Sequence, residues 1–230
     1  MANYTHLFFD LDDTLWDFKS NAYEALSDVF SEQQLNRFFC DFEQFYQLYE
    51  PKNKELWAAY GEGLISKDFL MAERFNYPLR CVGVSDDSLA LYLNNIFLKR
   101  TTTKTQLVPD AIEVLDELRK RNYTLVIVSN GFKSVQYQKL INSGLIGYFH
   151  TIVLSEEVGF LKPDERVFQE ALVRSGALPE QTLMIGDNYE TDILGAQKIG
   201  ITSILLAPEV PFGVSPKQVI DNLKGVFSFL

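Results

Sequence analysis

Four aspartates stand shortly after apolar runs, at spacings that suit chemistry on a charged substrate. Asp10 and Asp12 follow the first of these runs, and Asp187 and Asp192 follow a later one. Carboxylate oxygens are the ligands that Mg²⁺ prefers, and a carboxylate can also act as a nucleophile or as an acid and base. Two carboxylates placed two residues apart after a strand can splay to opposite sides of one reacting atom. The four aspartates are therefore candidates for a metal site and for group transfer.

A hydroxyl and an amine stand at comparable places in the chain. Ser129, Asn130 and Gly131 follow another apolar run, and Lys162 precedes a proline at the expected start of a helix. Each group has an ordinary structural explanation, because Asp, Asn and Ser often form turns or helix caps and Lys is usually a solvated surface group. Their joint occurrence at successive strand ends is harder to explain as a series of turns. We therefore treat all these groups as one candidate site.

The apolar runs predict the scaffold that this site needs. Each run is too short for a helix and is bounded by turn residues, so we expect buried strands. The predicted strands are His6–Phe9, Thr124–Val128, Thr151–Leu154, Thr182–Ile185 and Thr202–Leu206. Because ligands bind beyond the carboxyl ends of the strands in open parallel sheets, the candidate groups should meet in one crevice.

Helical signals lie between the strands. The predicted helices are Ala111–Arg121, Lys133–Ser143, Glu165–Ser175 and Thr191–Ile199. Gly144 and Gly200 follow two of them as candidate left-handed caps. The alternation of strands and helices implies right-handed crossovers. The predicted fold class is therefore α/β, a Rossmann-like parallel sheet with helices on both faces, into which an α-helical cap domain is inserted.

The segment from about residue 21 to residue 105 has a different texture, rich in aromatic and charged residues. Apolar residues recur there at helical spacing in Ala22–Phe30, Leu35–Tyr49 and Glu55–Tyr60. We expect a helical cap domain over residues 19–103. Residues 1–18 and 104–230 are expected to form the α/β core domain.

Composition narrows the classes of partner. The chain has 230 residues and a formal net charge of −10, which disfavours nucleic acid polymers and anionic membrane surfaces. Its two cysteines have no close spacing, it begins without a signal-peptide pattern, and no apolar run approaches the roughly 18 residues of a membrane span. We therefore expect a cytoplasmic protein. The sequence leaves the oligomeric state open.

The joint pattern of motifs resembles the haloacid dehalogenase superfamily. That superfamily carries D-x-D-x-T, a Ser or Thr after its second core strand, a Lys, and G-D-x-x-x-x-D, and this chain has all four in order. Three longer strings resemble the bacterial pyrimidine 5′-nucleotidases: residues 130–132, residues 155–159 with 162–163 following, and residues 53–57. The resemblance covers the whole chain. It implies a phosphoric monoester hydrolase and, within that class, a 5′-nucleotidase.

The resemblance also implies a Mg²⁺ cofactor. The carboxylates of Asp10 and Asp187 and the backbone carbonyl of Asp12 would hold the ion, and Asp192 would orient its water or its neighbours. Lys162 would supply a fixed positive charge to Asp10 and to the substrate phosphate. One metal and one lysine would thus form a small electropositive pocket in an acidic protein.

The implied reaction passes through an aspartyl phosphate. Asp10 would attack phosphorus, and Asp12 would protonate the leaving oxygen and then activate the hydrolytic water. Ser129 and the backbone N–H groups of Asn130 and Gly131 would bind the phosphate oxygens. The expected substrate is a small phosphate ester, a (deoxy)pyrimidine nucleoside monophosphate in particular.

Aromatic residues of the cap domain could contact the nucleobase. Trp57 and Tyr60 are the candidates for an apolar lid over the base. Aromatic residues at helical spacing more commonly pack inside a core, and the sequence alone does not decide between these two uses.

Other functions fit parts of the same pattern. A sugar phosphatase or phosphomutase of this superfamily would use the same two aspartates, Asp10 and Asp12. A haloacid dehalogenase needs neither a metal nor the second aspartate, so Asp12, Asp187 and Asp192 argue against it. A non-catalytic interaction module on this fold would be indicated by the loss of a motif residue, and all of these residues are present.

Overall fold

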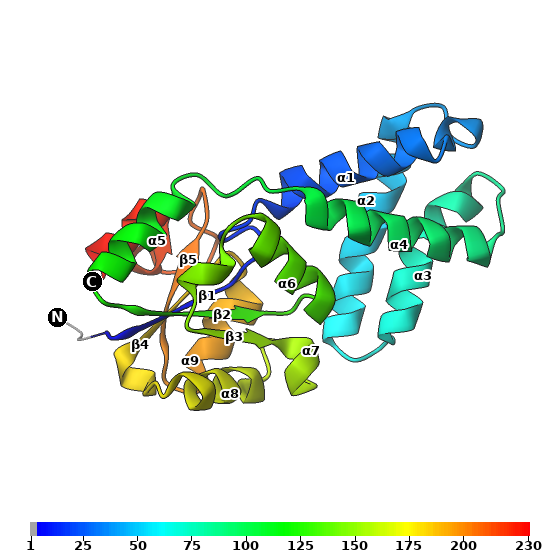
Figure 1. Ribbon diagram of the computed structural model, residues 1–230. Helices are drawn as coiled ribbons and strands as arrows, with labels where there is room; N and C mark the ends of the chain where they lie inside the picture. The colour runs from blue at the N-terminus through cyan, green and yellow to red at the C-terminus, as the bar shows by residue number, and fades with distance from the viewer. Residues whose placement is uncertain (1–3) are drawn as a thin grey trace. The chain divides into compact units, whose positions relative to one another are not determined.

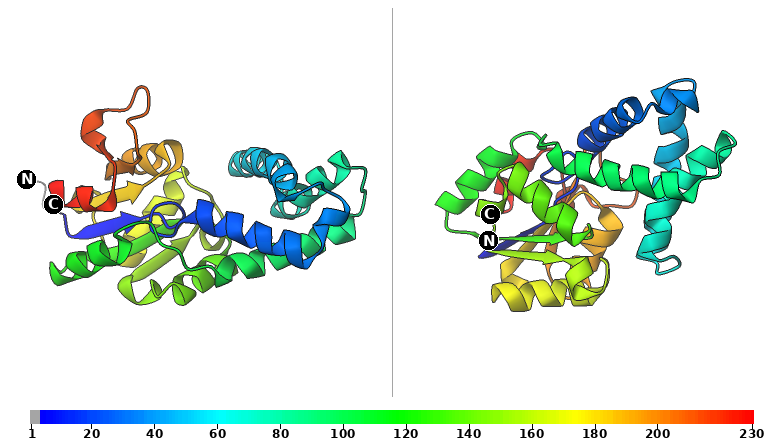
Figure 2. Two further views of the ribbon diagram at one scale, coloured as in Figure 1. Left: turned by 90° about the horizontal axis from the view of Figure 1, so that it is seen from above. Right: turned by 45° about the vertical axis from the view of Figure 1, so that its right-hand side comes forward.

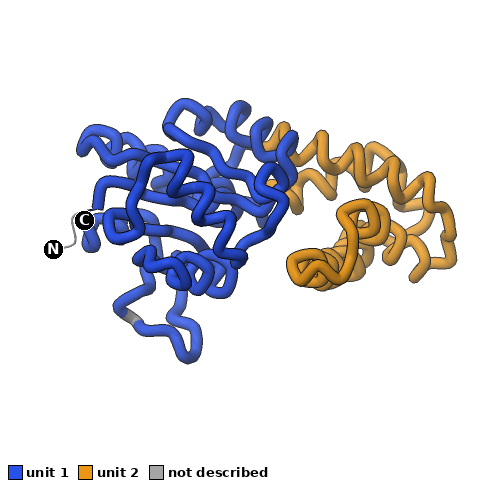
Figure 3. Tube along the Cα trace, turned by 90° about the horizontal axis from the view of Figure 1, so that it is seen from below, with its two compact units in different colours: residues 1–19, 105–230 blue, residues 20–104 orange. Residues whose placement is uncertain are grey.

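A computed structural model describes residues 4–230 and divides the chain into two compact units. One unit comprises Met1–Lys19 with Thr105–Leu230, and the other comprises Ser20–Lys104 (Figure 3). The predicted domain boundaries, after residues 18 and 103, lie one residue before those of the units. Within residues 4–230, no helix is both long enough and apolar enough to cross a membrane.

The larger unit is built on a parallel sheet, which confirms the predicted fold class. In residues 4–230 the sheet has six strands in the order β3-β2-β1-β4-β5-β6. The strands are β1 (His6–Phe9), β2 (Thr124–Ser129), β3 (Thr151–Leu154), β4 (Thr182–Gly186), β5 (Thr202–Leu206) and β6 (Val219–Ile220). The first five match the predicted strands to within one residue. The two-residue β6 was not predicted, because it is too short to form an apolar run.

Successive residues of each strand pack against opposite helical layers. Leu7 and Phe9 of β1 lie in a buried cluster with α5 (Ala111–Lys120) and α6 (Lys133–Asn142). Phe8 lies in a second cluster with α8 (Glu165–Ser175) and α9 (Gly195–Gln197). Figures 1 and 2 show these two pairs of helices on the two faces of the sheet. The helices of this unit are α5 (Ala111–Lys120), α6 (Lys133–Asn142), α7 (Ser155–Val158), α8 (Glu165–Ser175) and α9 (Gly195–Gln197).

One predicted helix of this unit takes a different form. Residues 191–199 were expected to form an α-helix, but a π-helical turn, Tyr189–Leu194, precedes the short α9. The side chain of Asn188 accepts hydrogen bonds from the backbone N–H groups of Glu190 and Thr191, and this fixes the start of the turn. The predicted glycine caps are confirmed, since Gly144 and Gly200 have φ values of 75° and 82°.

The second unit is helical, as expected for the inserted segment. Its helices are α1 (Phe18–Glu32), α2 (Phe42–Gly61), α3 (Lys67–Cys81) and α4 (Asp87–Thr103), the first of which starts in the larger unit. The helical segments predicted over 35–49 and 55–60 lie in one continuous helix, α2, except for the residues before Phe42. A 3₁₀ turn at Leu35–Arg37 precedes a single helix, which Asp41 caps and which continues through Pro51.

Aromatic side chains form the interior of the second unit. Phe45, Tyr49, Phe75 and Phe97 are buried, and their ring centroids lie between 5.1 and 6.2 Å apart. Rings at these separations in stacked, tilted or edge-on orientations stabilise a core beyond the area that they bury. For this group of residues, aromatic spacing therefore reflects packing.

Candidate active site

Asp10 leaves the central strand at the carboxyl edge of the sheet. Strand β1 pairs with β2 on one side and β4 on the other, and Phe9 is in register with Ile127 and Ile185. The backbone N–H of Asp10 continues this pattern by donating to the Ile185 carbonyl at 2.9 Å. The Asp10 side chain is thereby fixed between two neighbouring strand ends, and the residue is only 8% exposed.

Lys162 is buried beside Asp10 and is fully engaged. Its Nζ lies 2.7 Å from Oδ1 of Asp10, from Oδ1 of Asp192 and from the backbone oxygen of Val128. An ammonium group has three hydrogens, so all of them are used by these acceptors. Direct contact with a phosphate oxygen would require one of these three bonds to be exchanged.

The side chain of Asn130 fixes the segment that carries Lys162. Its Oδ1 accepts hydrogen bonds from the Lys162 backbone N–H at 2.7 Å and from the Ser155 hydroxyl at 2.5 Å. Its Nδ2 donates to the Lys162 carbonyl at 3.0 Å. Asn130 was predicted through its backbone alone, but its amide also joins the ends of β2 and β3 to the lysine.

The Ser129 hydroxyl is arranged as a hydrogen-bond donor. Its Oγ accepts from the side-chain Nε2 of Gln136 at 2.7 Å and from the backbone N–H of Gly131 at 3.3 Å. A hydroxyl oxygen with two donors on its lone pairs has its own hydrogen left to give. Ser129 is therefore suited to donate to an anionic oxygen at the strand end.

Three carboxylates converge next to Lys162. One carboxylate oxygen from each of Asp10, Asp187 and Asp192 lies within 4.8 Å of one carboxylate oxygen of each of the other two. Thr14, the last residue of the first motif, donates from its hydroxyl to Asp187 Oδ1 at 3.1 Å. Three negative charges against one lysine leave an excess of two, which a divalent cation with oxygen ligands would neutralise. The donor set therefore fits Mg²⁺.

The protonation behaviour of the cluster reflects this excess of negative charge. Burial raises the pKa of Asp10 well above its ordinary value, and the charges of Asp192 and Asp187 act in the same direction against Lys162. Burial, followed by the charges of Asp192 and Asp13, raises the pKa of Asp187 to about 7. Burial alone would lower the pKa of Lys162, but Asp10 and Asp192 outweigh it and hold the pKa above its ordinary value.

A family model described as haloacid dehalogenase-like hydrolase matches residues 7–206, a range that includes every motif residue described above. The chain belongs to this family. This match confirms the predicted superfamily and the predicted enzyme class, a phosphoric monoester hydrolase.

Relatives of this haloacid dehalogenase-like hydrolase are similar over nearly their whole length. The pyrimidine 5′-nucleotidase YjjG of Escherichia coli is 32% identical, over 94% of this chain and 93% of that protein. A glyceraldehyde 3-phosphate phosphatase of Methanothermobacter thermautotrophicus is 32% identical, over 89% of this chain and 86% of that protein. The crystal structure of Bacillus subtilis YfnB bound to magnesium has a TM-score of 0.87 and 30% identity, and covers 99% of each chain.

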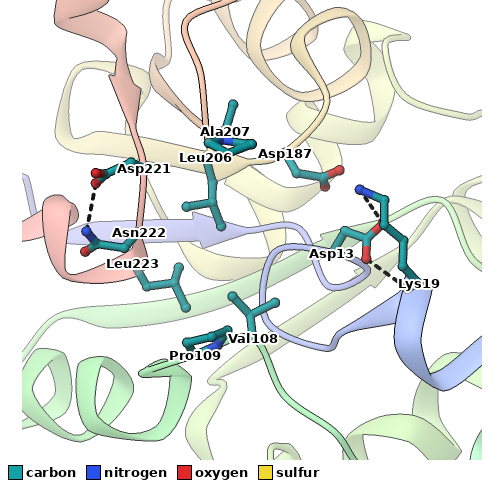
Figure 4. A pocket seen from close by; sticks show the side chains of 11 residues that line it. Asp13, Lys19, Val108, Pro109, Asp187, Leu206, Ala207, Asp221, Asn222 and Leu223 are labelled. Atoms are coloured by element: carbon teal, nitrogen blue, oxygen red, sulfur yellow. Dashed lines mark hydrogen bonds and ion pairs between the residues drawn. The ribbon is translucent and has the colours of Figure 1, made fainter.

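The hydrolase has a cavity of about 280 Å³ beside the carboxylate cluster (Figure 4). Asp187 and Asp13 border it together with Lys19, whose side chain points toward the two aspartates in the figure. Asp192, by contrast, is fully buried. Asp187 is therefore the member of the cluster that faces an open space.

Asp12 is held by two side chains that the sequence did not single out. Lys139 donates to its Oδ1 at 2.6 Å, and Gln136 donates to its Oδ2 at 2.9 Å. Both donors come from α6, where they are three residues apart and share one face of the helix. Their spacing places them on the helix face that also carries the buried Leu140. This was the sequence signal that could have indicated that they are buried.

The predicted base-binding aromatics lie in the second unit of the hydrolase. Trp57 and Tyr60 are both half-buried on α2, with their ring centroids 5.8 Å apart in an edge-on arrangement. This contact shows that the two rings form a pair within the unit. A role in contacting substrate stays a prediction.

Proposed function

We propose that this hydrolase is a Mg²⁺-dependent phosphomonoesterase that forms an aspartyl phosphate on Asp10. The observation that carries the proposal is the position of one buried ammonium group, that of Lys162, 2.7 Å from both Asp10 and Asp192. A carboxylate attacking a phosphate dianion must overcome charge repulsion, so a fixed cation at the nucleophile is the central requirement.

Four aspartates divide the metal and proton chemistry in this proposal. Asp10 and Asp187 hold the ion through their carboxylates and Asp12 through its backbone carbonyl. Asp192 orients its neighbours, because its carboxylate already accepts from Lys162 and from the Asn188 backbone N–H. When bound, Mg²⁺ supplies positive charge that balances the phosphate oxygens and the nucleophile.

Asp10 is the nucleophile in the first half of the reaction. Lys162 engages its Oδ1, which leaves the other oxygen to attack phosphorus. Ser129 and the backbone N–H groups of Asn130 and Gly131 bind the phosphate oxygens. Asp12 protonates the leaving oxygen and then removes a proton from the water that hydrolyses the aspartyl phosphate.

We propose (deoxy)pyrimidine nucleoside 5′-monophosphates as the preferred substrates. The similarity to the E. coli pyrimidine 5′-nucleotidase supports this choice. In this proposal residues 19–103 act as the cap, and Trp57 or Tyr60 packs on the nucleobase. We place the enzyme in the cytoplasm, where its exposed free cysteines, Cys40 and Cys81, would stay reduced.

A sugar or triose phosphate is the second candidate for the substrate. The glyceraldehyde 3-phosphate phosphatase relative has the same 32% identity as the nucleotidase, so similarity alone does not separate the two. A phosphomutase would use the same aspartates and would return the phosphoryl group to a second hydroxyl instead of to water.

The test measures phosphate release from nucleoside monophosphates, glyceraldehyde 3-phosphate and hexose phosphates, with Mg²⁺ and with excess chelator. Wild type should hydrolyse the pyrimidine nucleotides best and should lose activity in chelator. Asp10→Asn should be inactive while it keeps the wild-type circular dichroism spectrum. Turnover in chelator, or a near wild-type rate in the variant, would contradict the mechanism. A preference for sugar phosphates would contradict the proposed substrate but not the proposed mechanism.

A further inference from the structure

The side chain of Lys139 is buried and directed at Asp12. Its residue is 3% exposed, and its Nζ is 2.6 Å from Asp12 Oδ1. The ammonium also lies 4.3 Å from the ring centroid of Trp16 and 5.2 Å from that of Phe18. A lysine at a solvated helix face would expose its amine, whereas this one is desolvated against two aromatic rings and an acid. The local structure is therefore built around the contact with Asp12.

Gln136 holds the other oxygen of the same carboxylate. Its Nε2 lies 2.9 Å from Asp12 Oδ2 and 2.7 Å from Ser129 Oγ. With Lys139 on Oδ1, both oxygens of Asp12 accept from α6, so the plane of the carboxylate is fixed by two donors from one rigid element. The same amide sets the Ser129 hydroxyl, and one side chain thus spans two of the proposed catalytic parts.

Gly131 leaves the space that Gln136 occupies. A Cβ at this position would overlap the side-chain amide of Gln136. Gln136 is fully buried, and its Oε1 has no hydrogen-bond partner among the described residues. A buried amide with an unpaired oxygen costs free energy, so its position is maintained by what its Nε2 contacts.

We infer that Gln136 and Lys139 are positioning residues for Asp12, which fix the direction of its carboxylate toward the leaving oxygen of the substrate. The inference rests on the proposed function, in which Asp12 is the acid and base. The side-chain amine of Lys139 contacts the carboxylate of Asp12, and the amide of Gln136 contacts both that carboxylate and the Ser129 hydroxyl. Loss of Lys139 should therefore reproduce the defect of losing Asp12, in weaker form, and should leave formation of the aspartyl phosphate from a reactive ester largely intact.

The test compares two esters whose leaving groups need a proton to different degrees. A ribose 5′-oxygen is a poor leaving group and requires the acid, whereas nitrophenolate requires it little. Lys139→Met should lower kcat for a nucleoside 5′-monophosphate at least tenfold more than it lowers the rate of the nitrophenol burst from p-nitrophenyl phosphate, with KM little changed. Lys139→Arg should recover part of the loss. Lys133→Met removes an exposed lysine from the first turn of the same helix and should leave both rates unchanged.

A double variant separates positioning from a general structural effect. If Lys139 acts through Asp12, Asp12→Asn with Lys139→Met should be no worse than Asp12→Asn alone. An equal loss of the nucleotide kcat and of the nitrophenol burst rate, or a further loss in the double variant, would overturn the inference. If Lys139→Met does not fold, Gln136→Met is measured beside Ser129→Ala, because it removes the contact with Ser129 as well as the contact with Asp12. Only its loss beyond that of Ser129→Ala, and only where that loss depends on the leaving group, is assigned to Asp12.

The controls keep this inference distinguishable from the proposed function. If Asp12→Asn itself shows no dependence on the leaving group, Asp12 is not the acid and the proposed mechanism fails along with the inference. If Asp12→Asn shows the dependence and neither α6 variant does, the mechanism stands and the positioning role alone is wrong.

Discussion

Asp187 is the residue whose charge depends most on what occupies the site. Among residues 4–230 no lysine forms an ion pair with it like that of Lys162 with Asp10, and it accepts a hydrogen bond from the Thr14 hydroxyl. Burial and the charges of Asp192 and Asp13 raise its pKa to about 7. Near neutral pH its ionisation is therefore coupled to cation binding, because a bound cation favours the charged form.

The raised pKa of Asp187 predicts that stability in chelator falls as the pH rises. An unfolded aspartate titrates near pH 4 and the folded one at about 7. Between these values the unfolded state has lost its proton while the folded state retains it, so the free energy of unfolding decreases with pH. Urea denaturation measures the free energy of unfolding of wild type and of Asp187→Asn. The wild-type value minus the variant value should decrease from pH 4 to pH 7 and then level off.

Mg²⁺ should reverse this trend, because binding to the ionised carboxylates stabilises the folded state increasingly toward pH 7. Glu180→Gln, which removes an exposed acid of the same unit, serves as the control for the loss of one carboxyl group. A wild-type minus Asp187→Asn difference that is flat with pH in chelator would mean that Asp187 ionises as an ordinary surface carboxyl does.

The motif residues could be predicted from sequence, and the α6 residues could not, for a physical reason. Asp10 and Asp187 each follow a strand and Ser129 ends one, and parallel strands bring their carboxyl ends to one edge whatever the intervening chain does. Gln136 and Lys139 lie within a helix, where polar residues are usually solvated. Their burial depends on side-chain packing against Asp12, which is far away in the sequence.

At the scale of elements, strands were predicted well because the sheet is buried on both faces, and its strands are therefore continuous short apolar runs. The predicted bounds of the helices agree less well with the structure. Pro51 and its polar neighbours divide the pattern of α2 although the helix continues through them. The turn at Tyr189–Leu194 is wider than an α-helix, and helical spacing of apolar residues does not distinguish the two.

The end of β4 should tolerate no side chain at Gly186. A Cβ there would overlap the carboxyl group of Asp192, which the π-helical turn brings against the strand. Gly186→Ala should displace Asp192 from Lys162, lower the free energy of unfolding by about 1–3 kcal/mol and greatly reduce phosphatase activity. Thermal or urea unfolding and steady-state kinetics measure the two effects.

Gly147→Ala is the matched control, since a Cβ at Gly147 would meet no atom within 4 Å. This variant should keep activity and change stability by less than about 1 kcal/mol. A Gly186→Ala protein with wild-type kinetics would show that the position of Asp192 against the strand has no part in the reaction.

At the scale of the whole molecule, the prediction concerns the contribution of the second unit to substrate choice. If Trp57 or Tyr60 stacks on the nucleobase, its contact should contribute about 1–3 kcal/mol. Trp57→Ala and Tyr60→Ala should then reduce kcat/KM for nucleotides by the factor that corresponds to this free energy. The kcat/KM for a small aliphatic phosphate should stay unchanged. Tyr92→Ala, which removes an exposed ring from α4, is the control and should change neither. Equal losses on both substrates would assign the Trp57–Tyr60 pair to packing.

The most direct test of the account is the detection of phosphate on Asp10. Asp12→Asn, mixed rapidly with p-nitrophenyl phosphate and Mg²⁺, should release one nitrophenol per enzyme in a burst and then turn over slowly, because the base that activates water is missing. Acid quenching followed by peptide mass spectrometry should then find one phosphoryl group on the peptide that contains Asp10. Turnover without a burst and without phosphoryl transfer to that peptide would contradict a covalent mechanism at Asp10.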